Sequence, residues 1–341
     1  MTTSPDVSVH FAEGRDVSTW ERRHQQGEVP DRWPYGLDGL TKHFPTAKAR
    51  EVGALAPTKL LRSLFLRRSG PVDGGSVQLS WEEDVALRML QESPTGKVLT
   101  GVIWATDTDS SLSAKVKRFL IRRALRRAHL VWALSRPQVD VVSRWLGPGG
   151  PPVRYLRFGV DPDFWAEQQF PQRPMLFSAG GDRDRDPATL LKAIEIVRRT
   201  RPDIDVLVQS RTALTPPDGV KIVPYLTHSE LRAAYGRASV VAIATRPNLH
   251  ASGMTVSLEA MAVGRPVVIT STAGIDDYVA HGSTGFLVQP GDHEAMARHI
   301  IGLLDDHAAA ATMGRRARER VEEHFTSARM SDDIAAFAMT I

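Results

Sequence analysis

The stretch HASGMTVSLEAMAVGRPVVIT, residues 250–270, decides the fold class of this chain. Its last four residues, VVIT, predict a short buried strand, and VVAIAT at 240–245 predicts a second one. Residues 254–263 between them predict a helix that ends at Gly264, two residues before Pro266. A strand, a helix and a second strand in this order indicate a parallel sheet with helices on its faces.

Glu259 is the one charged residue of that helix. Apolar residues surround it on most sides, so an ionised carboxylate there is costly unless a partner offsets its burial. Two interpretations are open. Either Glu259 points out through a gap or pairs with nearby Arg265, or it belongs to a binding site.

The residues just before the helix favour a binding site. Ser252-Gly253-Met254-Thr255 places a small, permissive backbone where the helix presents its free N–H groups, and such an end suits a phosphate. Glu259 lies about one turn further in, where it could accept hydrogen bonds from sugar hydroxyls. Phosphate at the helix tip and hydroxyls on the carboxylate together describe a nucleotide. The alternative is an ordinary helix capped by Ser252 or Thr255.

Composition sets limits on the class of protein. The chain has 341 residues, 42% of them hydrophobic and none of them cysteine, which is enough for two domains and excludes disulfides and thiolate chemistry. No apolar run approaches membrane-spanning length, and MTTSPDVSVHF lacks a signal-peptide core, so we expect a soluble cytoplasmic protein. Residues 1–170 hold 24 Lys and Arg against 19 Asp and Glu, so the basic excess lies in the first half.

Strand-like and helix-like segments alternate in both halves. Strands are predicted at 7–11, 76–80, 97–105, 129–135 and 153–158, and then at 175–180, 204–210, 220–225, 240–245, 267–270 and 285–288. Helices are predicted at 81–91, 114–127, 136–146, 187–200, 228–236, 254–263, 293–304 and 308–324. This predicts an α/β fold of two Rossmann-like, doubly wound parallel-sheet domains that face each other across a cleft. The expected domains are residues 1–165, residues 166–326 and a C-terminal helix at 327–341 that returns toward the first domain.

The C-terminal half resembles a known family. SLEAMAVGRPVVITSTAGIDDYVAHGSTGFLVQPGD, residues 257–292, is similar to the donor-site signature of retaining GT-B glycosyltransferases of family 4, the glycosyl transferases group 1. FGVDPDFW (158–165) resembles their interdomain linker and RRARERVEEHFT (315–326) their closing helix. The resemblance implies transfer of a hexose from a UDP- or GDP-linked nucleotide sugar to a glycan, lipid or small-molecule acceptor, with retention and with no essential metal or separate cofactor.

The same resemblance assigns roles to residues at the predicted helix. Glu259 matches the second of two family glutamates and should bind the ribose hydroxyls. The first glutamate, which helps to hold the donor hexose, would fall at Ala251, so this chain departs from the pattern. His250, or the backbone of Gly253, Met254 and Thr255, is then left to orient the sugar.

A diphosphate that leaves without a metal needs cations and a helix N-terminus to stabilise it. SAGGDRDRDPATLLKAI (178–194) follows a predicted strand, contains the pair Gly180-Gly181 and opens a helix at Pro187. By resemblance, Arg183 and Arg185 stand where the family keeps its diphosphate-binding cations. The alternative is that the Asp-Arg-Asp-Arg-Asp run pairs internally on a solvated loop.

The first half matches the family less well. In PDRWPYGLDGL (30–40), Tyr35-Gly36 would replace the donor-facing loop and open a helix at Leu37. The family histidine after a central strand is missing from GVIWATDTDS (101–110), so Trp104 or Asp107 would stand in as a catalytic group.

Two other functions compete with this reading. The missing first glutamate suggests a non-catalytic nucleotide-sugar-binding protein. Asp107-Thr108-Asp109 fits the DxD pattern of metal-dependent GT-A transferases, but the pattern also occurs at 161–163, 182–184, 184–186 and 203–205. It is therefore a weak signal.

Basic residues repeat along the helix predicted at 114–127. Arg118, Arg122 and Arg126 recur every fourth residue beside an apolar arc, and KLLRSLFLRRSG (59–70) is a second basic and apolar stretch. Solvated helix faces are one explanation, and peripheral contact with an anionic membrane or an anionic acceptor is the other. We expect no nucleic-acid binding, because the chain has no recognised module for it.

Overall fold

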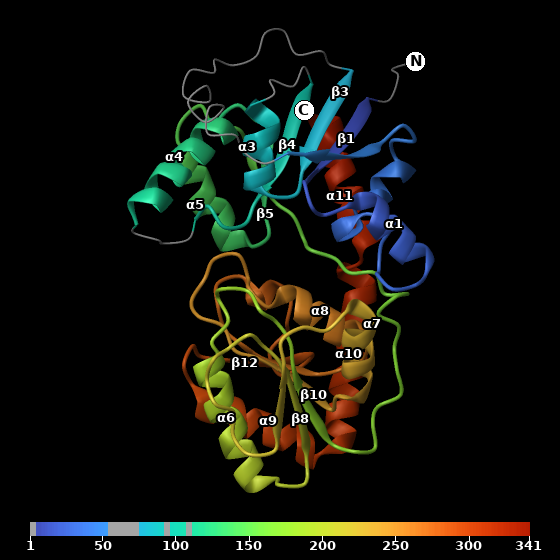
Figure 1. Ribbon diagram of the computed structural model, residues 1–341, viewed down its shortest axis with the longest axis vertical. Helices are drawn as coiled ribbons and strands as arrows, with labels where there is room; N and C mark the ends of the chain where they lie inside the picture. The colour runs from blue at the N-terminus through green and yellow to red at the C-terminus, as the bar shows by residue number, and fades with distance from the viewer. Residues whose placement is uncertain (1–4, 54–74, 92–95, 107–110) are drawn as a thin grey trace. The chain divides into compact units, whose positions relative to one another are not determined.

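The structure is a computed structural model that describes residues 5–53, 75–91, 96–106 and 111–341. The chain divides into two compact units, and each contains a six-stranded sheet with helices packed on it (Figure 1). Unit 1 comprises Met1–Gln25, Asp31–Arg157 and Ser327–Ile341, and unit 2 comprises Gln26–Pro30 and Phe158–Thr326. In the described ranges, no helix is long and apolar enough to cross a membrane.

The sheet of unit 2 has the strand order of dinucleotide-binding folds. Its parallel strands are β7 (Met175–Ser178), β8 (Asp205–Gln209), β9 (Val220–Val223), β10 (Val240–Ile243), β11 (Val267–Thr270) and β12 (Gly285–Val288). They lie side by side in the order β12-β11-β10-β7-β8-β9, so the direction of winding reverses between β7 and β10. Ligands of such sheets bind at the carboxyl ends of the strands beside this reversal.

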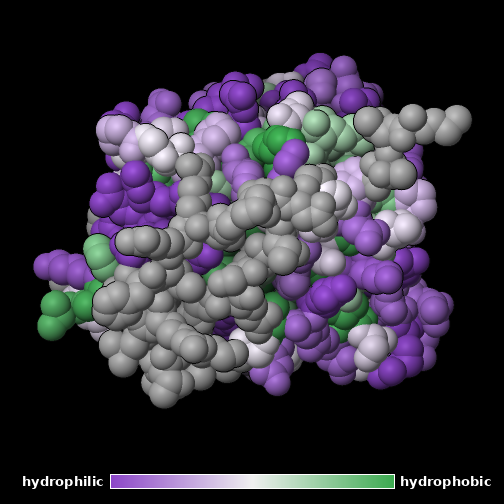
Figure 2. All heavy atoms as spheres, turned by 90° about the horizontal axis from the view of Figure 1, so that it is seen from above, coloured by the Kyte–Doolittle hydropathy of each residue, from purple (hydrophilic) through white to green (hydrophobic). Residues whose placement is uncertain are grey.

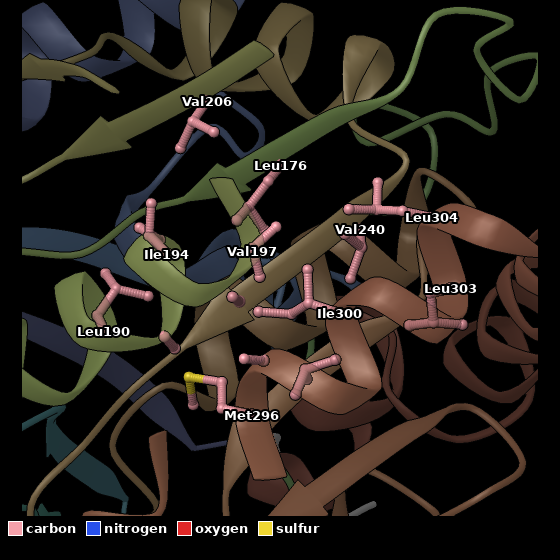
Figure 3. Close-up of a cluster of buried hydrophobic side chains, with 14 of the residues drawn as sticks. Leu176, Leu190, Ile194, Val197, Val206, Val240, Met296, Ile300, Leu303 and Leu304 are labelled. Atoms are coloured by element: carbon pink, nitrogen blue, oxygen red, sulfur yellow. The ribbon is translucent and has the colours of Figure 1, made fainter. Parts of the chain in front are cut away.

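Helices cover both faces of this sheet. On one face, α6 (Pro187–Thr200) and α9 (His293–Asp305) bury aliphatic side chains against the strands, and Figure 3 shows Leu190, Ile194, Met296 and Ile300 converging there. On the other face lie α7 (His228–Arg237) and α8 (Met254–Ala262), and α10 (His307–His324) packs on α8. The inner strands β7, β10 and β11 are fully buried, which is why they are nearly all apolar, whereas the edge strand β9 is partly exposed.

Unit 1 has a related parallel sheet. Its strands are β1 (Asp6–Ala12), β2 (Lys48–Val52), β3 (Ser76–Ser80), β4 (Lys97–Val102), β5 (Leu130–Ala133) and β6 (Val153–Tyr155), in the order β2-β1-β3-β4-β5-β6. Its helices are α1 (Val17–Gln25), the 3-10 segment η1 (Pro34–Lys42), α3 (Glu83–Gln91), α4 (Leu112–Leu125), α5 (Arg136–Leu146) and α11 (Ser327–Thr340). The reversal lies between β1 and β3.

The structure confirms the α/β fold of two doubly wound parallel sheets, and it adds elements that the sequence did not predict, among them β2 and α1. Strand β2, KAREV, is an edge strand with mostly exposed or half-buried side chains, and α1 buries none of its residues. Neither therefore carries the apolar periodicity on which the prediction depends. The main segment of unit 2 begins at Phe158 rather than after residue 165, because the apolar side chains of FGVDPDFW are buried in unit 2.

Candidate functional site

Two loops lie side by side at the carboxyl edge of the unit 2 sheet, where the winding reverses. The first follows β7 and the second follows β10. The backbone N–H of Asp186 donates to the carbonyl of Ala244 at 2.9 Å, and the N–H of Arg246 donates to the carbonyl of Asp184 at 2.7 Å. An isolated antiparallel bridge joins Arg185 to Thr245. The loop after β7 is thus fixed against the loop that leads into α8.

Asp182 holds the side chain of Arg185 in place. Arg185 Nε donates to Asp182 Oδ2 at 2.8 Å, and the hydroxyl of Ser252 donates to Asp182 Oδ1 at 3.0 Å. Only 14% of the Arg185 side chain is exposed, and its Nη1 is buried without a hydrogen-bond partner among the described residues. A buried N–H group of a cation with no acceptor is available to an anionic ligand.

Two glycines make room for this guanidinium. A Cβ atom built on Gly180 would lie 2.4 Å from Arg185 Nε, and one built on Gly253 would lie 3.2 Å from Arg185 Nη1. Both glycines have positive φ, +127° and +95°. The guanidinium therefore lies at the N-terminus of α8, and Gly181, with open space around it, lies at the rim of the loop.

Among the residues that the structure describes, no side chain caps the N-terminus of α8. Its N-cap residue is Gly253, and Ser252, a possible cap by sequence, gives its hydroxyl to Asp182 instead. Thr255 does not act as the cap either. The N–H of Met254 donates to the carbonyl of Ala251 at 3.0 Å, so the next N–H groups of the first turn, beginning with that of Thr255, are the kind of donors that bind phosphate at helix ends. They lie beside the positive charge of Arg185.

Glu259 is buried on α8 and has a partner that sequence reasoning missed. The phenol of Tyr235 on α7 donates to Glu259 Oε2 at 2.8 Å. Burial raises the pKa of Glu259 to about 7, although the Tyr235 hydrogen bond and the charge of Arg185 both lower it. The ring of Tyr235 is fully buried between Phe177 and Trp165, with centroids 5.2 and 5.7 Å away, so its hydroxyl is firmly placed.

Arg265 does not pair with Glu259, and that interpretation was wrong. Its guanidinium is buried and donates to five backbone carbonyls, those of Tyr235, Gly236, Gly264, Gln168 and Gln169, at 2.8–3.3 Å. Burial lowers its pKa to about 10, so it stays protonated at neutral pH. Its role is to join the end of α7 to the segment after Trp165.

His250 is buried rather than solvated. It is 3% exposed, and its Nε2 lies 3.3 Å from Asp184 Oδ2, so it links the two loops. Ala251, at the position of the missing glutamate, is fully buried and has a φ of +52°, a conformation that L residues rarely adopt. The backbone is therefore turned sharply just before α8.

Arg183 differs from Arg185 in its exposure. Its side chain is 57% exposed and lies 3.9 Å from Asp184. The loop does pair internally, as the alternative interpretation proposed, but the pair of Arg185 and Asp182 is largely buried rather than solvated. Asp186 caps α6 by accepting from the N–H of Thr189 at 3.1 Å.

In unit 1, Tyr35 and Gly36 lie in η1 with left-handed φ values of +66° and +70°. The Tyr35 ring stacks on Trp81 after β3 at 4.7 Å, and Arg15 after β1 donates to its hydroxyl at 2.8 Å. Burial raises the pKa of Tyr35. A Cβ on Gly36 would lie 2.6 Å from Ser327 Cβ of α11, so only glycine fits there. Tyr35 thus lies between the segments that follow β1 and β3, where the winding of the unit 1 sheet reverses.

The segment after β4 is anchored by a buried acid. Glu83 accepts from the N–H groups of Ile103 at 2.8 Å and Trp104 at 2.7 Å, and burial raises its pKa to about 7. Trp104 is half-buried. Asp107 and Asp109 lie outside the described residues, as does the basic stretch at 59–70.

Most aspartates of the DxD patterns form hydrogen bonds or ion pairs with other residues of the chain. Asp182 binds Arg185, Asp186 caps α6, and Asp203 and Asp205 pair with Arg201 and Arg173. Asp161 accepts from the N–H of Asp163. In the ranges that the structure describes, no three His, Asp or Glu side chains gather as metal ligands would.

The arginine row of α4 is not a free basic face. Arg126 donates to the carbonyls of Leu146 and Pro148, the latter at 2.8 Å, and Arg122 donates to Leu146 at 3.5 Å. These carbonyls lie at the end of α5, where cations are favourable. The sequence missed this use because the contact depends on how α4 and α5 pack.

Parts of this chain are similar to known proteins. Residues 176–306 match the family model described as glycosyl transferases group 1. Glycogen synthase of Mycobacterium tuberculosis is 27% identical over 218 residues, 59% of this chain and 51% of that protein. D-Inositol 3-phosphate glycosyltransferase of Pseudarthrobacter chlorophenolicus is 34% identical over 164 residues, 43% of this chain and 38% of that protein. The chain thus spans about half the length, or less, of these curated relatives.

A solved structure extends the likeness to the whole fold. Anabaena HepE, determined in complex with UDP and glucose, superimposes with a TM-score of 0.68 at 14% identity and covers 99% of this chain and 100% of its own. The chain has the GT-B fold, and its residues 176–306 match the family model of glycosyl transferases group 1.

Proposed function

We propose that this protein is a glycosyltransferase that moves a hexose from a nucleoside-diphosphate sugar to an acceptor, with retention and without a metal. One observation carries the proposal. Arg185, the uncapped N-terminus of α8 and Glu259 meet at the winding reversal of unit 2. They supply a cation, free N–H donors and a carboxylate in the order that a diphosphate and a ribose require.

Each group has a defined task in this proposal. Glu259, ionised, accepts hydrogen bonds from the ribose hydroxyls. The N–H groups of α8 and the guanidinium of Arg185 bind the diphosphate. When the bond between the sugar C1 and the phosphate oxygen breaks, its electron pair stays on that oxygen, and these donors stabilise the new charge. C1 of the sugar forms its new bond to the oxygen of an acceptor hydroxyl, and the proton of that hydroxyl passes to the departing diphosphate.

Metal independence is proposed because the protein itself supplies positive charge at the diphosphate. HepE was determined with UDP and glucose, which supports a UDP-linked donor. A GDP-linked donor is the second candidate, because no described contact selects the base.

The acceptor in this proposal is a glycan, a lipid or a small molecule. The proposal also includes a peripheral contact of unit 1 with an anionic membrane.

A second candidate function is nucleotide-sugar binding without catalysis. It is favoured by Ala251, which provides no carboxylate where the family has its hexose-binding glutamate. His250 and the backbone at 253–255 would then hold the sugar without orienting it for transfer.

Donor hydrolysis separates the two functions. The protein is incubated with UDP-glucose, UDP-N-acetylglucosamine or GDP-mannose, and the release of UDP or GDP is followed with and without EDTA. The transferase should release nucleotide slowly, and Arg185→Ala should abolish the release. Tight binding with no release from any donor would favour the binding protein. Release that requires Mn²⁺ or Mg²⁺ would revive a metal-dependent mechanism.

A further inference from the structure

Helix α4 in unit 1 exposes three large apolar side chains on one face. Leu112 is 79% exposed, Val116 51% and Phe119 55%. They recur at spacings of four and three residues, so they form one row along the helix. In Figure 2, hydrophobic atoms project at the left margin, on the side where Figure 1 draws α4.

The row is not the core-facing side of the helix. Leu120, Ile121, Ala124 and Leu125 make up that side and are buried in a cluster with α3 and α5. The helix is thus apolar on two sides. Three exposed aliphatic and aromatic residues in one row are more than the scattered single ones that any surface carries.

The charges of α4 are all of one sign. The helix contains five Lys and Arg residues and no Asp or Glu. Lys115 and Arg123, both exposed, border the apolar row, whereas Arg122 turns away to the carbonyl of Leu146 at the end of α5. An apolar row bordered by cations is the pattern of a helix that lies in the plane of an anionic lipid surface.

We propose that the face formed by Leu112, Val116, Phe119, Lys115 and Arg123 docks unit 1 on an anionic membrane surface. A second copy of the chain fits this face poorly, because a symmetric contact would bring the same cations together. A bound peptide helix would need a groove, and this row lies on the outer side of a helix. The inference rests on the proposed peripheral contact and not on the donor chemistry.

Co-sedimentation of the full chain with vesicles tests the proposal. At low salt, the protein should sediment with vesicles of phosphatidylcholine mixed with phosphatidylglycerol and stay in the supernatant with phosphatidylcholine alone. The variant L112S/V116S/F119S should lose affinity for the anionic vesicles by roughly 100-fold. The variant K115E/R123E should lose it by about tenfold or more, and high salt should do the same.

Leu214 and Tyr225 in unit 2, 47% and 56% exposed, provide the matched control. L214S/Y225S should bind the anionic vesicles as well as the wild type does. Circular dichroism should show that all three variants fold, since every changed side chain is exposed. Donor hydrolysis is measured separately, so either proposal can fail alone.

Three outcomes would overturn the inference. The wild-type protein could stay in the supernatant with anionic vesicles at low salt. The triple serine variant could bind them undiminished, which would place the contact elsewhere on the chain. Finally, sedimentation velocity could show a wild-type dimer that the triple variant converts to a monomer while no vesicles are bound, which would assign the row to self-association.

Discussion

The hydroxyl of Tyr235 donates a 2.8 Å hydrogen bond to Oε2 of Glu259 in the interior of unit 2. Burial raises the pKa of Glu259 to about 7 and raises that of Tyr235 well above its ordinary value, so the phenol keeps its proton and remains the donor. Because the bond stabilises the ionised carboxylate, the protonation state of Glu259 depends on Tyr235.

Nucleotide affinity should therefore increase with pH. Below the pKa of about 7, Glu259 is protonated and accepts ribose hydrogen bonds poorly; above it, the carboxylate accepts them well. Calorimetric titration of UDP and GDP between about pH 5.5 and 8.5 should show affinity rising through neutrality. Tyr235→Phe removes the stabilising bond, so the rise should move to higher pH. A variant that is weaker by the same factor at every pH would indicate a loss of packing only.

Glu259→Gln should separate stability from binding. The pKa of Glu259 is raised in the folded state, so its contribution to stability is fully present below the ordinary pKa of 4.5 and is lost as pH rises through about 7. The neutral amide avoids that loss. In urea unfolding at pH 8, the free energy of unfolding of the variant should equal that of the wild type or exceed it by up to about 3 kcal/mol. Its nucleotide affinity should nevertheless fall tenfold or more. Undiminished affinity in the folded variant would remove Glu259 from the ribose site.

The two loop arginines should differ in their effect on phosphate. Arg185→Ala should weaken UDP binding by about 10- to 100-fold, since a hydrogen bond to a charged group contributes about 1.5–3 kcal/mol. Uridine, which has no phosphate, should bind nearly as before. Arg183→Ala, at a side chain that is 57% exposed, should have a smaller effect on UDP. Equal losses for UDP and uridine in Arg185→Ala would mean that Arg185 supports the loop and does not touch the diphosphate.

Gly253→Ala should damage both the fold and the site. The new Cβ would lie 2.8 Å from Ile269 Cδ1, 3.0 Å from Ile243 Cγ2 and 3.2 Å from Arg185 Nη1, at a φ of +95°. We expect a loss of about 2–3 kcal/mol in the free energy of unfolding, together with weaker UDP binding because Arg185 is displaced. Gly302→Ala on α9 is the control. Its Cβ would meet nothing within 4 Å, and alanine favours the helix by about 0.5–1 kcal/mol. If both changes had the same effect, the crowding around Gly253 would not matter.

Apolar periodicity in the sequence predicted most of the fold. Buried parallel strands appear as short apolar runs, and core-facing helices appear as apolar residues at helical spacing. The buried acid on α8 was also visible, since Glu259 interrupts an apolar helix. Its partner Tyr235 was not, because Tyr235 lies 24 residues away on another helix and such a contact leaves no local pattern in the sequence. The contact of Arg122 could not be predicted for the same reason. Its helical spacing was visible in the sequence, but the carbonyl of Leu146 that accepts its hydrogen bond is brought near only by the packing of α5 on α4.

The position of α11 has a consequence for how the chain is made. This helix follows every residue of unit 2 but belongs to unit 1, where it packs on η1 and buries Met330, Ile334 and Ala335. Domains generally fold as they leave the ribosome. Unit 2 therefore has all of its segments once Thr326 has emerged, whereas the sheet that starts at β1 must wait for α11. The half of the protein that is synthesised first is the last to be completed.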